Sequence, residues 1–240
     1  MGSCGRARAA SLVVCFITAI VLAVASAPAA AQGCPELVGR WPYGTALTVA
    51  VSGEYLYFGQ GFGLTVAELT DPTAPRVVAE VTGLPDYPQF FAISGGFAYV
   101  VDAIGGLSVV DVTTPTAPVL VGFAQTSASF GYGVAVAGGH AFLGAGPWGL
   151  VVVDVSDPTA PVEVAALDTA GVAYEVAVAG GFAYLADEAA GLRVIDVSDP
   201  TTPLEVGVVD TPGWAVGVTV AGGLAYVSDY DAGLRRERRP

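Results

Sequence analysis

Hydrophobic residues in most of the chain occur in short alternating runs that are separated by Gly, Pro and Asp. Residues 174–209 illustrate the pattern, because their small and branched residues alternate with period two, which is typical of half-buried β-strands. The runs predict four strands, over 174–179, 182–187, 192–197 and 204–209. Gly-Gly between the first two runs permits the positive φ of a tight hairpin. No window combines helical periodicity with helix caps, so the pattern predicts an all-β fold.

The same pattern returns at a fixed period along the chain. Gly-Leu marks each copy and recurs at spacings of 43, 43, 42 and 42 residues. The copies stand at Gly63-Leu64, Gly106-Leu107, Gly149-Leu150, Gly191-Leu192 and Gly233-Leu234. Four short strands per period of this length predict the blades of a β-propeller, each a four-stranded antiparallel sheet. A β-helix is the alternative, but its coils are shorter and lack paired hairpin turns.

The repeat array begins and ends with an incomplete set of strands. Residues 35–39 match the fourth strand at 203–207, and residues 214–229 supply a first and a second strand. A fifth blade would therefore combine strands from both ends of the chain, which removes exposed edges. After Arg235 the repeat predicts Val-Ile-Asp-Val, whereas residues 235–240 form an aberrant basic tail. The sequence predicts either about five blades with the last incomplete and a poor edge strand, or a truncated chain or fragment of a larger ring.

The N-terminus has the features of a secretory signal peptide over residues 1–31. Two arginines precede a continuous apolar run at 12–25, and small residues follow it. An uncleaved anchor and a lipid attached to Cys34 are the alternatives. Cleavage would leave the repeats at 32–234, no transmembrane segment, and no internal disulfide. We therefore expect a secreted or extracytoplasmic protein, in the periplasm or on the cell surface.

The third strands carry a recognisable motif. They read Leu-Ser-Val-Val-Asp at 107–111, Leu-Val-Val-Val-Asp at 150–154 and Leu-Arg-Val-Ile-Asp at 192–196, with turns such as Val-Ser-Asp-Pro after them. This resembles the LVIVD-repeat family of bacterial and archaeal surface or secreted proteins, over residues 35–234. The copy at 64–68 departs from the motif by ending in Glu. The resemblance implies a β-propeller outside the cell and brings no catalytic residue.

Composition excludes several kinds of chemistry. The net charge of −13 argues against nucleic-acid binding, and the absence of Lys excludes lysine Schiff bases and P-loop chemistry. His140 is the one histidine and follows a hairpin turn, where we expect an exposed side chain, and no Gly-x-Ser-x-Gly elbow accompanies it. The Gly-rich stretch at 59–63 fails the dinucleotide-binding fingerprint, because no helix follows it, and we expect a loop there.

Aspartates recur once per repeat in two places, in the third strand and before a Pro. These are Asp111, Asp154 and Asp196, and Asp71, Asp157 and Asp199. A residue that recurs in every blade is expected to have a structural role, here hydrogen bonding in turns or at strand edges. No cofactor is predicted, except that Asp229 and Asp231 are weak candidates for binding Ca²⁺, which prefers several converging oxygens.

In a propeller, the loops after the second strands and after the fourth strands share one face. Here these loops vary and carry aromatic and acidic residues, which recognition surfaces use. The candidate binding residues are Tyr87, Tyr132, Trp148, Tyr174, Asp187, Trp214, Asp229 and Tyr230. Trp41, Tyr43, Phe62, Phe130, Glu175 and Glu188 accompany them. Alternatively, the aromatic residues pack between blades or plug the channel.

The sequence therefore predicts a non-catalytic extracytoplasmic scaffold that binds an unknown protein or glycan through this face. One alternative is a hydrolase or lyase that uses carboxylates or a bound cation on the same face. Another is a structural spacer in a surface assembly. The ligand, the blade number and the oligomeric state do not follow from the sequence.

Overall fold

The computed structural model describes residues 46–128 and 130–238. These residues form five antiparallel sheets, four with four strands and a fifth with three. The first sheet contains β1 (Ala46–Ser52), β2 (Tyr55–Gln60), β3 (Gly63–Glu68) and β4 (Arg76–Thr82). The second contains β5 (Pro88–Ser94), β6 (Phe97–Asp102), β7 (Gly106–Asp111) and β8 (Val119–Gln125). The third contains β9 (Gly133–Ala137), β10 (His140–Gly144), β11 (Leu150–Asp154) and β12 (Val162–Leu167).

The fourth sheet contains β13 (Val176–Ala179), β14 (Phe182–Ala186), β15 (Leu192–Asp196) and β16 (Leu204–Val209). The fifth contains β17 (Gly217–Ala221), β18 (Leu224–Ser228) and β19 (Leu234–Arg238), with a 3-10 helix, η1 (Tyr230–Ala232), before β19. The predicted signal peptide, Cys34 and the predicted strand at 35–39 lie outside the described residues.

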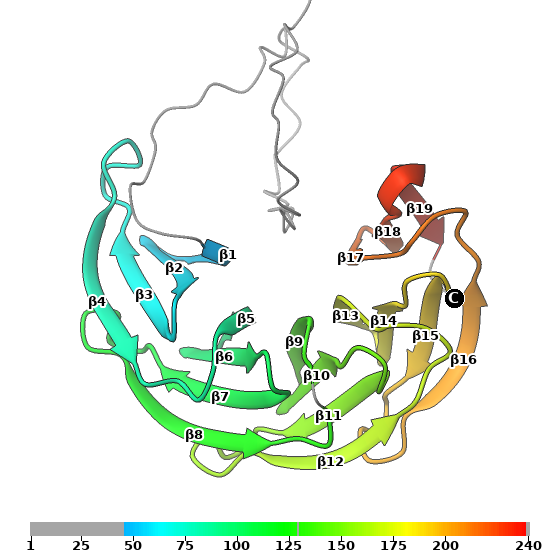
Figure 1. Ribbon diagram of the computed structural model, residues 1–240, viewed down its shortest axis with the longest axis horizontal. Coiled ribbons are helices and arrows are strands. Elements are labelled where there is room, and N and C mark those ends of the chain that lie inside the picture. Colours follow the sequence, from blue (N-terminus) through cyan, green and yellow to red (C-terminus); the bar gives the residue numbers. More distant parts are fainter. Residues whose placement is uncertain (1–45, 129, 239–240) are drawn as a thin grey trace, which may run out of the picture.

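The sheets stand side by side around a common centre as the blades of a β-propeller (Figure 1). The first strand of each sheet lies innermost, and successive inner strands β1, β5, β9, β13 and β17 contact one another. The fourth strands β4, β8, β12 and β16 form the rim. Figure 1 shows the arc open between β1 and β17. The predicted all-β propeller with four-stranded blades is therefore confirmed.

Each complete blade repeats the same backbone irregularity in its fourth strand. In the fourth sheet Val194 is opposite Gly207 and Ile195 is opposite Glu205, so Val206 is an extra, bulged residue. Val78, Val121 and Val164 are the corresponding residues of the first three sheets. Such bulges bend and twist a strand. These three valines are partly buried and pack against the hydrophobic clusters between blades.

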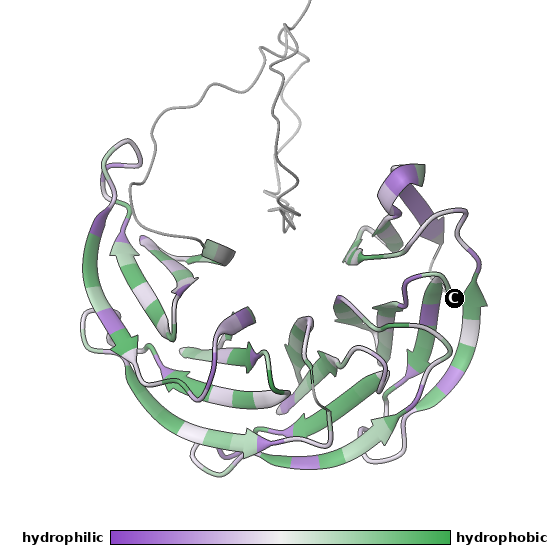
Figure 2. Cartoon of the chain, viewed as in Figure 1, coloured by the Kyte–Doolittle hydropathy of each residue, from purple (hydrophilic) through white to green (hydrophobic). Residues whose placement is uncertain are grey.

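The hydrophobic core lies between neighbouring blades, and Figure 2 shows the hydrophobic residues along the strands that form it. One cluster joins Phe142, Leu150 and Val152 of the third blade to Val176 and Leu185 of the fourth. The leucine of the Gly-Leu marker is buried in this way in the first four blades, where its exposure is 0–1%. Burial between blades thus explains why the marker returns with the repeat.

The recurring aspartates have the predicted structural role. Asp111 Oδ1 accepts hydrogen bonds from the Thr113 N–H at 2.8 Å and the Thr113 hydroxyl at 2.6 Å. Asp157 and Asp199 bind the threonine two residues later in the same way. The hydroxyl bond, and then the amide bond, hold the pKa of these three carboxyl groups below the ordinary value. These aspartates stabilise turns on the face opposite the variable loops.

His140 Nδ1 lies 3.1 Å from the Gly138 carbonyl, and its side chain is half-buried rather than exposed as predicted. His140 stands at the start of β10, opposite Asp154 of β11, and its ring centroid lies 6.5 Å from that of Phe142. None of the described residues belongs to a helix long and apolar enough to cross a bilayer.

The first residues of the tail at 235–240 belong to the last repeat. β19 crosses the expected boundary at residue 234 and pairs antiparallel with β18, so that Tyr226 is opposite Arg236. Arg235 occupies the place that Arg193 has in β15. The described part of the tail is an edge strand of the fifth sheet, as expected for the incomplete last blade, and the truncated chain or fragment of a larger ring stays a prediction.

Candidate functional site: the loop face

The loop face consists of the loops after each second strand and after each fourth strand. Backbone hydrogen bonds hold the two sets together. Gly146 and Ala173 exchange bonds of 2.9 and 2.8 Å, and Glu188 and Ala215 exchange two bonds of 3.0 Å. Each pair joins the loop of one blade to the segment that enters the next blade. The prediction that both sets of loops share one face is therefore confirmed.

Asp187 lies inside this face rather than on it. Its side chain is 0% exposed. The carboxylate accepts hydrogen bonds from the Thr169 hydroxyl at 2.8 Å and the Gly171 N–H at 3.0 Å. The Arg193 guanidinium donates a third bond at 3.1 Å. Burial raises the pKa of Asp187, against the lowering effects of Thr169 and Arg193. The expectation that this carboxylate lines an accessible binding surface is corrected, because it anchors the loop from within.

Asp229 has the same position in the fifth blade and is also buried. It accepts a hydrogen bond from the Gly213 N–H at 3.1 Å and lies 3.5 Å from Arg235 Nε. Asp102 of the second blade likewise accepts bonds from the Gly106 and Ile104 amides, at 2.6 and 3.2 Å. The expected exposure of Asp229 is therefore corrected too, because loop amides without strand partners need an internal acceptor. The signal was present in the sequence, since all three aspartates stand at one repeat position.

The aromatic candidates remain accessible and form three groups. Phe62 and Tyr87 have ring centroids 4.1 Å apart at the junction of the first two blades. Trp214 and Tyr230 form the second group, with centroids 5.9 Å apart and ring planes at 27°. The third group connects Phe130 to Tyr132 and Trp148, and Tyr132 to Tyr174 at 4.9 Å. Trp41 and Tyr43 lie outside the described residues.

Exposure differs within these groups. Trp214 and Tyr230 are 52% and 50% exposed, and Tyr87 and Trp148 are also exposed. Tyr132 and Tyr174 are half-buried against each other. The face thus combines exposed rings, which a ligand can contact, with rings that support the loops.

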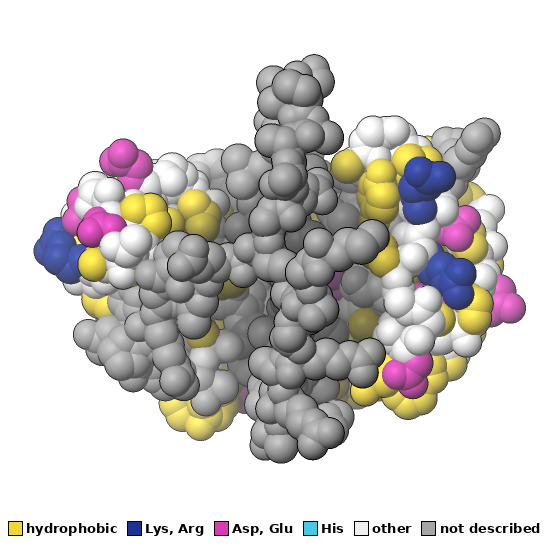
Figure 3. Space-filling view, turned by 90° about the horizontal axis from the view of Figure 1, so that it is seen from above, with side chains coloured by type: hydrophobic (Ala, Val, Ile, Leu, Met, Phe, Trp, Pro, Cys, Tyr) yellow, Lys and Arg dark blue, Asp and Glu magenta, His cyan; other side chains and the backbone are white. Residues whose placement is uncertain are grey.

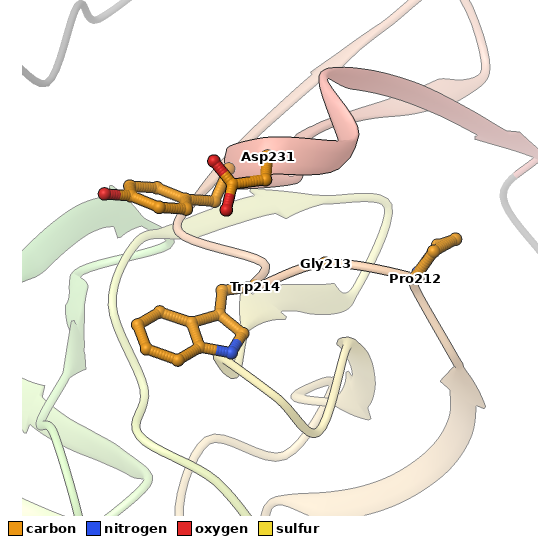
Figure 4. Close-up of a pocket in the computed structure, with 5 residues that line it drawn as sticks. Pro212, Gly213, Trp214 and Asp231 are labelled. Carbon is orange, nitrogen blue, oxygen red and sulfur yellow. The ribbon is translucent and has the colours of Figure 1, made fainter.

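The fifth blade has a pocket of about 300 Å³ beside the Trp214–Tyr230 pair. It is lined by Pro212, Gly213, Trp214, Tyr230 and Asp231. Figure 4 shows that Trp214 and Asp231 come from two different segments that lie on two sides of the pocket. Sequence reasoning missed Pro212 and Gly213, and placed Asp231 on the loop face and as a weak Ca²⁺ candidate but not in a pocket. No motif marks this pocket, because its walls meet only in the folded chain.

Glu175 stands at the loop-face end of the inner strand β13. Its Oε2 accepts a hydrogen bond from the Val218 N–H of β17 at 3.2 Å. A Cβ on Gly217 would lie only 2.9 Å from this oxygen, so a glycine makes room for it. Burial raises the pKa of Glu175 to about 7, against the lowering effect of the Val218 amide. It is a carboxyl group with a pKa suited to proton transfer near neutral pH.

The described residues contain no group of three or more His, Cys, Asp or Glu side chains placed to hold a metal ion. Asp229 is buried and Asp231 lies exposed at the pocket. The Ca²⁺ site at these two residues stays a prediction.

Two solved structures are similar in fold. The computationally designed Ika8 protein matches with a TM-score of 0.66 and 12% identity, over 81% of this chain and 58% of that chain. The Pan2 WD40 domain of Neurospora crassa matches with a TM-score of 0.61 and 14% identity, over 80% of this chain and 61% of that domain. This chain therefore spans about three-fifths of the length of each. None of the curated proteins matches.

The radial sheets and their loop face define a β-propeller repeat protein. A family model described as the LVIVD repeat matches residues 43–82, 89–126, 132–169, 170–211 and 212–235. The chain belongs to the LVIVD-repeat family.

Proposed function

We propose that this protein is a non-catalytic scaffold that binds a protein or glycan through the aromatic side chains of its loop face. The observation that carries the proposal is the exposure of Trp214, Tyr230, Tyr87 and Trp148 on this one face. Exposed aromatic side chains are enriched at binding hot spots, and the loops that carry them stand on a rigid scaffold. The turns on the opposite face are short and held by their own aspartates.

The test is a binding screen against glycan and peptide panels with matched variants. Trp214→Ala with Tyr87→Ala should abolish a ligand signal seen with the unchanged chain. Val119→Ala is the control, because Val119 is exposed at the start of the rim strand β8, at the end opposite the loop face. Equal loss in the control, or a ligand signal that survives in the loop variant, would count against the proposal.

A carboxylate-based hydrolase or lyase is the second candidate, and Glu175 is the observation that favours it. Its pKa of about 7 allows a carboxyl group to exchange protons at neutral pH. The screen should therefore include turnover measurements on glycan and peptide substrates. If the unchanged chain shows turnover and Glu175→Gln abolishes it without disturbing the fold, the protein is an enzyme and the scaffold proposal is wrong.

We also propose an extracytoplasmic location, supported by the signal-peptide pattern of residues 1–31. Cell fractionation of an epitope-tagged chain tests it.

The Ca²⁺ proposal is tested by thermal melting in calcium and in chelator. A rise in Tm with calcium that Asp231→Asn removes would support a site, because a ligand of the folded state stabilises it, and an unchanged Tm would count against one.

A further inference from the structure

The pocket of the fifth blade combines two exposed aromatic rings with a free carboxylate. We propose that it binds a cationic group, a guanidinium or alkylammonium, presented by a basic partner protein. This inference rests on the proposed function of the loop face and names the chemistry of one site on it.

The walls of the pocket are fixed before any ligand arrives. The Asp229 carboxylate binds the Gly213 N–H, and so joins the segment of Trp214 to the loop of Tyr230. A Cβ on Gly213 would lie 2.4 Å from the Asp229 carbonyl oxygen, so only glycine permits this approach. The Ala232 N–H also donates to the Asp229 carbonyl at 2.7 Å, which closes the turn. Such preorganisation lowers the entropy that binding must overcome.

A second contact holds the Trp214 segment from the neighbouring blade. Ala215, the next residue, exchanges two backbone hydrogen bonds with Glu188 of the fourth blade. Tyr230 has φ of 38°, a left-handed conformation that is uncommon for a residue other than glycine. The two rings are therefore held in place by backbone that has little freedom to rearrange.

The ring geometry favours a cation that lies beside the two rings over any group inserted between them. Their centroids are 5.9 Å apart, whereas an inserted sugar ring needs about 7 Å, two van der Waals contacts of 3.5 Å or more. A cation is attracted when it lies within about 6 Å of a ring centroid, so one cation beside this pair can contact both rings. Asp231, which also lines the pocket, supplies the opposite charge.

The charge of the surrounding face acts in the same direction. Asp168 and Asp210 are exposed at the ends of the loop-face segments that follow β12 and β16. Arg235, the nearest arginine along the chain, forms an ion pair of 3.5 Å with Asp229, whereas Arg236 is exposed and opposes this effect. With a net charge of −13, the protein attracts a basic partner and repels acidic sugars and phosphates.

The test follows the fluorescence of Trp214 in a chain that carries Trp41→Phe and Trp148→Phe. The probes are tetramethylammonium, an arginine-rich peptide, the same peptide with neutral citrulline, and methyl glucoside. We expect saturable changes with the first two probes and none with the last two. Asp231→Asn should weaken cation binding three- to tenfold. Tyr230→Asn should weaken it at least as much, because Asn tolerates the left-handed backbone but lacks the ring.

The control is Asp157→Asn on the opposite face, which should leave cation binding unchanged. Equal binding of the citrulline peptide, or an affinity that Asp231→Asn does not change, would overturn the cationic ligand. Saturable binding of methyl glucoside that tetramethylammonium does not compete with would show that the pocket binds a sugar instead of a cation. In those cases the loop face still binds a ligand, so the proposed function stands. Absence of binding by every probe would overturn this inference alone, because the panel screen tests the face independently.

Discussion

Asp102, Asp187 and Asp229 stand at the same place in three blades and hold the loop face together from within. All three are buried; Asp187 and Asp229 each accept an amide of the segment that enters their blade, and Asp102 accepts two amides of its own loop. Two of them also face an arginine from the third strand, Arg193 or Arg235. The loop face thus depends on buried charges, which are costly unless they are hydrogen-bonded.

Asp187→Ala should destabilise the protein strongly. The substitution leaves the Arg193 guanidinium buried without its 3.1 Å partner and the Gly171 amide without its acceptor. Breaking a buried ion pair by removing one member costs about 3–5 kcal/mol. Urea denaturation measures the change in the free energy of unfolding. Asp168→Ala, at an exposed aspartate that precedes Thr169 in the chain, should change it by less than about 0.5 kcal/mol. Similar losses in both variants would contradict the anchoring role.

Glu175 should make stability depend on pH between about 4.5 and 7. Because its pKa in the folded protein is raised to about 7, the folded state binds the proton more tightly than the unfolded state. Its contribution is complete below pH 4.5 and is lost as the pH rises through 7. The shift corresponds to at most about 3 kcal/mol, since the side chain keeps some contact with solvent.

Glu175→Gln should therefore be more stable than the unchanged chain at pH 8, and the difference should shrink toward pH 5. Melting curves over this range provide the measurement. Asp102 and Asp187 also have raised pKa values and leave a residual slope in both proteins. A constant difference between the two proteins at all pH values would show that Glu175 does not titrate in this range.

At the scale of elements, the repeat pattern accounts for most strands and for the inward position of their leucines. The hairpins follow from Gly-Gly turns, where Gly95 and Gly96 have φ of 59° and 84°. β19 was harder to predict, because its residues after Leu234 are charged instead of apolar. Pairing with β18 satisfies the backbone hydrogen bonds of β19 whatever its side chains are. The strand therefore forms although its residues lack strand propensity and the hydrophobic pattern of the repeat.

Where β19 departs from the repeat, a fourth-strand residue of the preceding blade is more exposed than its equivalents. Val206, the bulged residue of β16, is 50% exposed, whereas its equivalents in the first three sheets are partly buried. In the third and fourth blades, Val164 packs in the cluster that contains Ile195. The fifth blade has Glu237 at the position of Ile195, so an apolar partner for Val206 is missing there.

Leu192 and Leu234 provide a matched pair for testing how burial between blades sets stability. They occupy equivalent positions, yet they are 1% and 71% exposed. Leu192→Ala should lower the free energy of unfolding by about 2–5 kcal/mol, because it leaves a cavity between blades. Leu234→Ala should change it by less than about 0.5 kcal/mol. Denaturation of both variants at low protein concentration makes the comparison. A large loss for Leu234→Ala would mean that another segment covers this leucine in solution.

At the scale of the whole molecule, both ends of the open arc present surfaces that are buried elsewhere in the ring. Val49 on β1 is 48% exposed, whereas its equivalents Phe91, Val176 and Val218 are 4–8% exposed and Val134 is partly buried. Leu234 is the corresponding case at the other end. Figure 3, which looks toward the opening, shows exposed hydrophobic side chains beside arginines at both ends. The sequence repeat alone does not predict that Val49 and Leu234 are exposed, because their exposure depends on whether their blade has a neighbour on that side.

Terminal repeats of an array need a polar outer face, and apolar positions left exposed at both ends of one chain favour head-to-tail association. We therefore expect the chain to self-associate as its concentration rises. Val49→Lys and Leu234→Lys should each weaken association, because each places a charge in one half of the contact. Val162→Lys, an equally exposed apolar site on the rim strand β12, is the control. Sedimentation velocity over a hundredfold concentration range makes the measurement. A monomer at every concentration would show instead that the ends are covered within one chain, as the predicted fourth strand at 35–39 would do at β19.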